Sequence, residues 1–401
     1  MKFQASIGCI TFLALVVVTG SAAIASDDGR PPLKQGDAIT LIAREGVVTK
    51  LDTLPYVESE YTKRYKFDSF DNPKLKELRD RYHLDEVVAP GKTEFDRQVL
   101  LLDWVNHRFK KFGKPSSPAR GALDVLAAVD EGHSFFCSQY GDVLVSAAAS
   151  LGWVDRPLAL RRPDSRGHGS TEHTSTEIWS TQYRKWVLFD PTFAMYVEKD
   201  GVPLNAYEFR QEWFYHDGTD VVFVMDKDRK RVHKSDMPVL RGRYAGFGDL
   251  VFDPGATDVY AFIGYVPNTD LLDRGSDWGN MFITRDKICD GTQWHKRPSP
   301  ADPARDPYFP INQAAVTLTI EGPALRVRLK TLTPNFKTYL IRLDGGEWTD
   351  QRETFAWVPR NGANHLEIKT VNQFGVDGPI STVELEMKTG RKDEGDRRPS
   401  K

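Results

Sequence analysis

An amphipathic helix is predicted between Ser134 and Leu151. Its apolar side chains recur at steps of three and four residues, at Tyr140, Leu144, Ala147, Ala148 and Leu151. Ser134 is expected to cap the start of the helix, and Gly152 is expected to end it. Cys137 then lies in the first turn, where unpaired backbone N–H groups and the positive end of the helix dipole favour a thiolate.

A β-hairpin is predicted further along the chain. Two short runs rich in β-branched and aromatic residues flank the polar turn 180–183. If Trp179 and Arg184 close this turn, antiparallel pairing places His173 opposite Asp190. A general base and the carboxylate that orients it are then expected to be neighbours.

The period of two along a strand predicts which side chains share a face of this hairpin. His173, Glu177, Trp186 and Asp190 all fall on the same side. Pro191 cannot continue a central strand, so Asp190 is expected at the tip of its strand, close to a surface cleft.

Short motifs surround these positions. Residues 136–142 read Phe-Cys-Ser-Gln-Tyr-Gly-Asp, Glu177 follows His173 by four residues, and Asp190 begins an Asp-Pro-Thr sequence. Over roughly residues 90 to 200, this arrangement resembles the transglutaminase-like superfamily of papain-type cysteine enzymes. The resemblance implies that Cys137 is the nucleophile, His173 its general base and acid, and Asp190 the group that orients the imidazole.

The sequence departs from that family pattern at two points. Ser175 stands where the family often has an aromatic residue, two positions after the histidine. The usual upstream glutamine or tryptophan that helps to hold the oxyanion is not evident, and Gln139 and His133 are the nearby candidates. His168, in a polar loop that contains glycine, is a rival general base.

The expected reaction is acyl transfer at an amide. Attack of the Cys137 thiolate gives a tetrahedral oxyanion and then a thioester, which water or an amine resolves. The expected partner is a peptide or amide substrate, including one in a cell-envelope or extracellular polymer, and no cofactor is implied. Hydrolysis and transamidation both stay open, although an exported location without calcium-loop motifs favours hydrolysis.

Three other interpretations of these residues stay open. In an oxidising compartment Cys137 and Cys289 form a disulfide, in which case the thiol is not a nucleophile. Cysteine, histidine and aspartate also bind zinc, but the paired short spacings of structural zinc sites are missing. Alternatively, the chain is a non-catalytic scaffold that binds polysaccharide, with Trp278 and Trp294 stacking on sugar rings.

The C-terminal part of the chain predicts a β-sandwich over residues 311–388. Apolar and polar residues alternate at 325–330 and 382–387, and turn sequences rich in Asp, Asn and Gly separate further strand-like segments. This pattern resembles immunoglobulin-like and fibronectin type III modules. A cut at about Asp306 is therefore expected to leave the preceding core soluble.

The overall prediction is an α+β protein with a transglutaminase-like core followed by an all-β sandwich. Asn72-Pro73 and the Thr93/Asp96 pair mark the starts of two helices before the core helix. The predicted regions are a signal peptide (1–25), an N-terminal extension (26–90), the core (91–235), an irregular β-containing connection (236–310), the sandwich (311–388) and a disordered tail (389–401).

Composition narrows the location and the partners. The apolar run from Ile7 to Val18, followed by Ala23-Ile24-Ala25, fits an export signal, so the protein is expected to be periplasmic or secreted. No later apolar run is long enough for a membrane span. The formal net charge of −2 argues against nucleic acid as the main partner. Nothing in the sequence indicates the oligomeric state.

Overall fold

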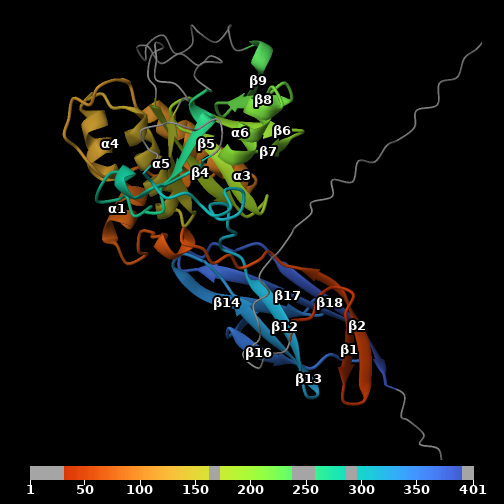
Figure 1. Ribbon diagram of the computed structural model, residues 1–401. Coiled ribbons are helices and arrows are strands. Elements are labelled where there is room, and N and C mark those ends of the chain that lie inside the picture. Colours follow the sequence, from red (N-terminus) through yellow and green to blue (C-terminus); the bar gives the residue numbers. More distant parts are fainter. Residues whose placement is uncertain (1–30, 162–171, 237–257, 286–295, 391–401) are drawn as a thin grey trace, which may run out of the picture.

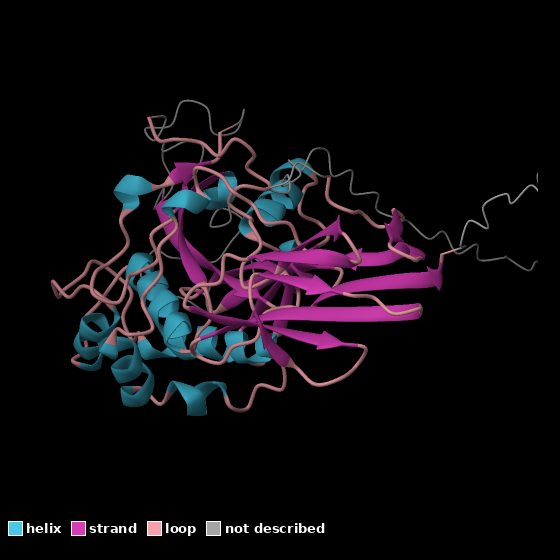
Figure 2. Ribbon diagram, turned by 90° about the horizontal axis from the view of Figure 1, so that it is seen from below, coloured by secondary structure: helices cyan, strands magenta, loops and turns pink. Residues whose placement is uncertain are grey.

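The computed structural model describes residues 31–161, 172–236, 258–285 and 296–390 (Figure 1). Helices and several antiparallel sheets are both present, which confirms the α+β class. Figure 2 shows the helices gathered on one side of the long strands. The predicted signal peptide and most of the predicted tail lie outside the described residues.

The helices precede most of the large sheet in the sequence. They are α1 (Pro73–Arg81), α2 (Leu84–Val88), α3 (Glu94–Arg108), α4 (Ala122–Asp130), α5 (Cys137–Ser150) and α6 (Ala206–Tyr215). Both early helix starts are confirmed: Asn72 accepts a hydrogen bond from the Lys74 backbone, and Thr93 and Asp96 form a capping box.

The helix that carries the cysteine starts later than expected. Phe136 is its N-cap, and α5 begins at Cys137, so the predicted cap at Ser134 is wrong. The Ser134 hydroxyl donates instead to the carbonyl of Lys114, at 2.8 Å. The Gln139 side chain accepts from the Phe136 backbone N–H at 3.2 Å and supports the helix start. Cys137 is therefore the first helical residue, as close to the positive end of the dipole as a helical residue lies.

The largest sheet of the protein is antiparallel and has nine strands. Its order is β11-β10-β3-β4-β5-β6-β8-β9, with β7 paired to β6. The strands are β3 (Asp155–Arg161), β4 (Glu172–Ser180), β5 (Lys185–Asp190), β6 (Met195–Lys199), β7 (Val202–Pro203), β8 (Val221–Met225), β9 (Lys230–His233), β10 (Phe262–Tyr265) and β11 (Phe282–Ile283). Within the predicted irregular connection, Asp258–Ala261 forms a 3₁₀ turn directly before β10.

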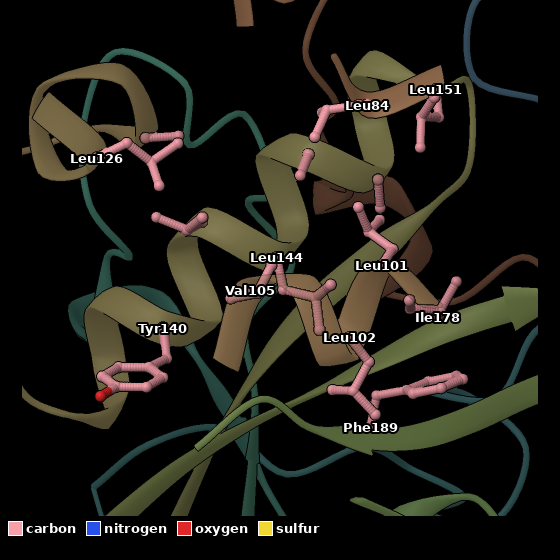
Figure 3. Packing of buried hydrophobic residues seen from close by; sticks show 14 of the residues in the cluster. Leu84, Leu101, Leu102, Val105, Leu126, Tyr140, Leu144, Leu151, Ile178 and Phe189 are labelled. Carbon is pink, nitrogen blue, oxygen red and sulfur yellow. The ribbon is translucent and has the colours of Figure 1, made fainter. Parts of the chain in front are cut away.

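The two faces of this sheet have different neighbours. Ile178 and Phe189 belong to one hydrophobic cluster with side chains of α3 and α5, and Figure 3 shows them close to Leu101 and Leu102. The opposite face carries a second hydrophobic cluster, which includes Tyr61, Trp179, Trp186, Leu188, Phe209 and Phe309. Strands β4 and β5 are therefore buried on both sides, which fixes their register strongly.

The hairpin register differs from the prediction by two residues. Trp179 pairs with Trp186, not with Arg184. Arg184 has a φ of 54° and its backbone N–H bonds to the carbonyl of Thr181, so Arg184 belongs to the turn. A register shift of two residues leaves every side chain on its predicted face of the sheet. His173 and Asp190 therefore stay on the same face, as diagonal neighbours.

Two smaller sheets share a third hydrophobic cluster. A six-stranded sheet contains β1 (Ala38–Leu41), β2 (Arg44–Asp52), β18 (Ser381–Thr389), β17 (Gly362–Asn372), β14 (Phe336–Leu343) and β15 (Thr349–Gln351). A three-stranded sheet contains β12 (Ala315–Glu321), β13 (Ala324–Lys330) and β16 (Thr354–Trp357). In Figure 1 the red β1 and β2 lie beside the blue C-terminal strands. The pairing of β2 with β18 was not foreseen, and it joins the predicted N-terminal extension to this sheet.

A buried ion pair ties the central strands together. Arg156 on β3 and Glu177 on β4 are both fully buried, and Arg156 Nε and Nη2 donate to Glu177 Oε2 at 2.9 and 2.6 Å. Glu177 Oε1 accepts from the Ala206 backbone N–H at 2.7 Å and from the Tyr308 hydroxyl at 3.1 Å. The Arg156 guanidinium also lies 4.2 Å from the ring centroid of Trp186.

We expect the removal of one partner of this ion pair to lower the stability of the folded protein. Glu177→Ala leaves Arg156 charged and buried, so it is expected to lower the free energy of unfolding by about 3–5 kcal/mol. The double variant Arg156→Met/Glu177→Met is expected to lose less, because it leaves no unpaired charge. Urea denaturation of the three proteins measures both values. A double variant that loses as much as Glu177→Ala does would show that packing, rather than the lone charge, determines the cost.

The hydrophobic cluster around Trp186 includes residues beyond Asp306, where the sequence analysis places a cut. Trp186 Nε1 donates to the carbonyl of Phe309 at 2.9 Å, and both Phe309 and Ile311 are buried in the cluster around Trp186. A chain of residues 54–306 is therefore expected to be less soluble than a chain of residues 54–313 and to unfold at a lower temperature. Soluble yield and thermal unfolding compare the two, and equal melting temperatures would mean that residues 307–313 add nothing to this core.

Candidate functional site

The structure brings the three predicted site residues together. Cys137 starts α5, His173 lies near the start of β4, and Asp190 ends β5. His173 Nε2 lies 2.7 Å from Asp190 Oδ2, and the His173 side chain also forms a hydrogen bond with Cys137. Because Nε2 is engaged by the carboxylate, Nδ1 is the ring nitrogen left for the sulfur.

A glycine allows the cysteine helix to approach the histidine strand. Gly141 lies one turn after Cys137 on α5, and a Cβ at this position would lie 3.1 Å from Thr174 Cγ2 and 3.5 Å from Thr176 Cγ2. A larger side chain would push α5 away from β4. The close approach also lets the backbone of Thr174 hydrogen-bond to the Cys137 sulfur.

The charges around the thiol favour its ionised form. Burial opposes a thiolate at Cys137, but the charge of His173 and the hydrogen bonds from His173 and Thr174 outweigh it, so the pKa of Cys137 is lowered. Burial also opposes a charged His173, but Asp190 and Cys137 outweigh it and raise the pKa of His173 to about 10. Both shifts favour a thiolate–imidazolium pair over a neutral thiol and a neutral imidazole.

Asp190 is held at both of its oxygens. Its Oδ1 accepts from the backbone N–H groups of Thr192 and Phe193 at 3.0 and 3.3 Å. Its Oδ2 accepts from the hydroxyl of Tyr260 at 3.3 Å, in addition to His173. Tyr260 was missed by the sequence analysis, because nothing in an apolar run of residues signals a contact 70 positions away.

A cavity of about 540 Å³ opens beside Cys137. Most of its wall is apolar, from Phe112, Phe136, Ala159, Leu160, Trp278 and Met281. Its polar lining comes from Cys137, Ser138, Glu172, His173, Thr174 and Arg297, with Gly279 completing the wall. Few polar groups in a mainly apolar hollow are typical of a binding site for a small molecule or a peptide segment.

Trp278 and Ser138 line both this cavity and a second one of about 430 Å³. The loop that carries Trp278 is anchored to α5. The hydroxyl of Ser276 donates to Asp142 Oδ1, and its backbone N–H lies 3.3 Å from the same carboxylate. Burial raises the pKa of Asp142 to about 7. The aromatic wall is therefore attached to the same helix as the thiol.

The other residues considered from the sequence have other contacts or lie outside the described residues. His133 Nδ1 lies 3.0 Å from the Ser116 hydroxyl. Gln139 Oε1 accepts from Phe136 and Ser138, and Ser175 donates to the carbonyl of Phe189. His168, Cys289 and Trp294 lie outside the described residues, and Cys137 carries a free thiol.

In residues 31–161, 172–236, 258–285 and 296–390, no group of three or more His, Cys, Asp or Glu side chains is placed to hold a metal ion. Every helix in the same ranges is too short or too polar to cross a bilayer.

Comparison with known proteins finds distant similarities. No protein-family model and no curated protein matches the sequence. A putative cysteine protease from Cytophaga hutchinsonii is similar in structure, with 11% identity and a TM-score of 0.26, over 37% of this chain and 49% of that one. Red sea bream transglutaminase is similar with 12% identity and a TM-score of 0.25, over 86% of this chain and 78% of that one. The chain thus matches about half the length of the Cytophaga protein.

The electrostatics of the pair predict how the thiol reacts with an alkylating agent. Without the imidazolium, the thiolate fraction at about pH 6.5 falls, so His173→Ala is expected to slow iodoacetamide labelling of Cys137 there by about tenfold or more. Near pH 9.5, above the ~8.5 of an ordinary thiol, the rates are expected to converge. His133→Ala removes a neighbouring surface histidine and serves as the control. Overlapping rate profiles for wild type and His173→Ala would contradict the assignment.

Proposed function

We propose that this protein is a transglutaminase-like, cysteine-dependent acyl-transfer enzyme. One observation carries the proposal. The Cys137 thiol at the N-terminus of α5 is hydrogen-bonded to His173, whose Nε2 lies 2.7 Å from the buried Asp190, and both Cys137 and His173 border a cavity of about 540 Å³. Nucleophile, base and orienting carboxylate have the mutual geometry that covalent acyl transfer requires.

The proposed reaction begins with attack of the Cys137 sulfur on the amide carbonyl carbon. The carbonyl oxygen becomes an oxyanion, and the unpaired backbone N–H groups at the start of α5 are the nearest source of donors for it. His173 then gives its proton to the leaving amine as the C–N bond breaks, which leaves a thioester. His173 next removes a proton from water, and the attacking oxygen displaces the sulfur.

We favour hydrolysis of a peptide or amide over transamidation. The sequence begins with an apolar segment that fits an export signal, so we place the protein in the periplasm or outside the cell. There the substrate includes amide bonds of a cell-envelope or extracellular polymer. We assign the two smaller sheets, which share one hydrophobic cluster, to an immunoglobulin-like or fibronectin type III-like β-sandwich.

One observation favours a second function, polysaccharide binding by a non-catalytic scaffold. Trp278 is partly buried and lines both the cavity that contains Cys137 and the second cavity. An aromatic face in a cleft suits stacking against a sugar ring. This scaffold has no need of an ionised thiol, however, so the charges around Cys137 favour the enzyme.

The test uses a mixture of peptides and cell-envelope fragments in water enriched in ¹⁸O. Hydrolysis is expected to place ¹⁸O in newly formed carboxylates, whereas transamidation leaves an unlabelled amide. Cys137→Ala is expected to abolish both products while retaining the wild-type fold, and His133→Ala is the matched control. Equal product formation by Cys137→Ala would refute the proposed nucleophile. No product from any protein, with retained binding of a polysaccharide, would favour the scaffold.

A further inference from the structure

A guanidinium lines the cavity that contains the proposed nucleophile. Arg297 borders the same space as Cys137 and His173. Its Nη1 donates to the carbonyl of Gly279, the residue after Trp278. Since an arginine side chain has five N–H donors, this bond fixes the group on the cavity wall and leaves most of its donors for a ligand.

The negative charge in the lining is already compensated. Among the described residues that line the cavity, Glu172 carries the carboxylate, and Arg161 forms an ion pair with it. Within the described ranges, Arg297 forms an ion pair with no carboxylate, and its side chain donates to the carbonyl of Gly279. The described lining therefore has a surplus of positive charge at the end formed by Arg297.

The apolar walls make this charge effective. Phe112, Phe136 and Met281 line the cavity around the thiol. An apolar surrounding lowers the local dielectric and strengthens the attraction between a guanidinium and an anion. Carboxylates match the planar fork of arginine and are bound through two parallel hydrogen bonds.

The wall that holds Arg297 is connected to the nucleophile helix. Asp142 on α5 accepts from Ser276, two residues before Trp278, and Arg297 is bonded to Gly279 just after it. The guanidinium and the thiol thus belong to one connected framework. A preorganised charge of this kind loses little free energy when it binds a ligand.

We propose that the cavity selects amide substrates that carry a carboxylate close to the scissile bond, and that Arg297 binds this carboxylate. The inference rests on the proposed function and names its substrate class. The apolar wall contacts the neighbouring part of the substrate. Arg297 is thus a specificity residue, and Cys137, His173 and Asp190 supply the chemistry.

A pair of alkylating agents tests this without a known substrate. Iodoacetate and iodoacetamide have similar size, and each reacts with the Cys137 thiolate by forming a C–S bond and releasing iodide. The two agents differ in charge, because iodoacetate carries a carboxylate and iodoacetamide does not. The ratio of their rate constants, divided by the same ratio for a small free thiol, measures the preference of the cavity for a carboxylate.

We expect Arg297→Gln to lower this normalised ratio by about three- to tenfold. The charge of His173 also attracts iodoacetate, but it is present in both proteins and cancels in the comparison. Arg274→Gln is the matched control. It removes one positive charge from the loop that carries Trp278, at a residue that pairs with Asp270, and it is expected to keep the wild-type ratio.

A second measurement needs no variant. Phenylacetate, which combines a carboxylate with an apolar ring, is expected to protect wild-type Cys137 from iodoacetamide at lower concentration than phenylacetamide. An unchanged ratio in Arg297→Gln, or equal protection by the two compounds, would overturn the carboxylate site while leaving the nucleophile intact. If both agents label wild-type Cys137 only as fast as they label an ordinary thiol, the result would instead overturn the proposed function itself.

Discussion

The buried ion pair between Arg156 and Glu177 is the interaction on which the rest of the structure depends. Two charges without access to water are tolerated only where each has a full set of partners. Glu177 meets this condition by binding Arg156, the start of α6 and the hydroxyl of Tyr308 at once. Those partners come from distant parts of the sequence, and together they determine where β4 lies. His173 is four residues from Glu177 on the same face of this strand, so the position of the imidazole follows from the same constraint.

The other face of β4 determines where the thiol lies. Side chains of α3 and α5 pack on Ile178 and Phe189, and Gly141 allows α5 to lie close to Thr174. Cys137 is the first residue of that helix, where the dipole and the imidazolium act in the same direction on the sulfur. One strand, buried on both sides, thus sets the distance between the helix that carries Cys137 and the imidazole of His173. The chemistry proposed for the site is a result of packing as much as of residue type.

Local rules predicted much of this arrangement. The helix around Cys137 followed from its apolar spacing, and the shared face of His173 and Asp190 followed from the period of a strand. That second inference survived an error of two residues in the hairpin register, because an even shift preserves the faces. The error arose at Arg184, whose left-handed backbone conformation extends the turn, and a propensity argument does not anticipate such a conformation in arginine.

Features that depend on distant contacts were not predictable in this way. Tyr260 reaches Asp190 across 70 positions, β2 pairs with β18, and Phe309 packs on Trp186. Ser134 has the right residue type for a helix cap, but its hydroxyl is taken by the carbonyl of Lys114. Trp278 and Arg297 line the cavity from segments before and after β11, and neither segment has a periodic sequence pattern. In each case tertiary contacts decide between locally acceptable alternatives.

The most direct test of the account is the protonation state of His173, followed by ¹⁵N NMR of the imidazole as the pH is raised. In the wild-type protein both ring nitrogens are expected to stay protonated through neutral pH, because the thiolate and Asp190 raise the pKa of His173 to about 10. In Cys137→Ala the transition is expected at a lower pH, because the thiolate is gone. A wild-type imidazole that loses its proton near the ordinary value of about 6.5 would contradict the thiolate–imidazolium pair and the chemistry built on it.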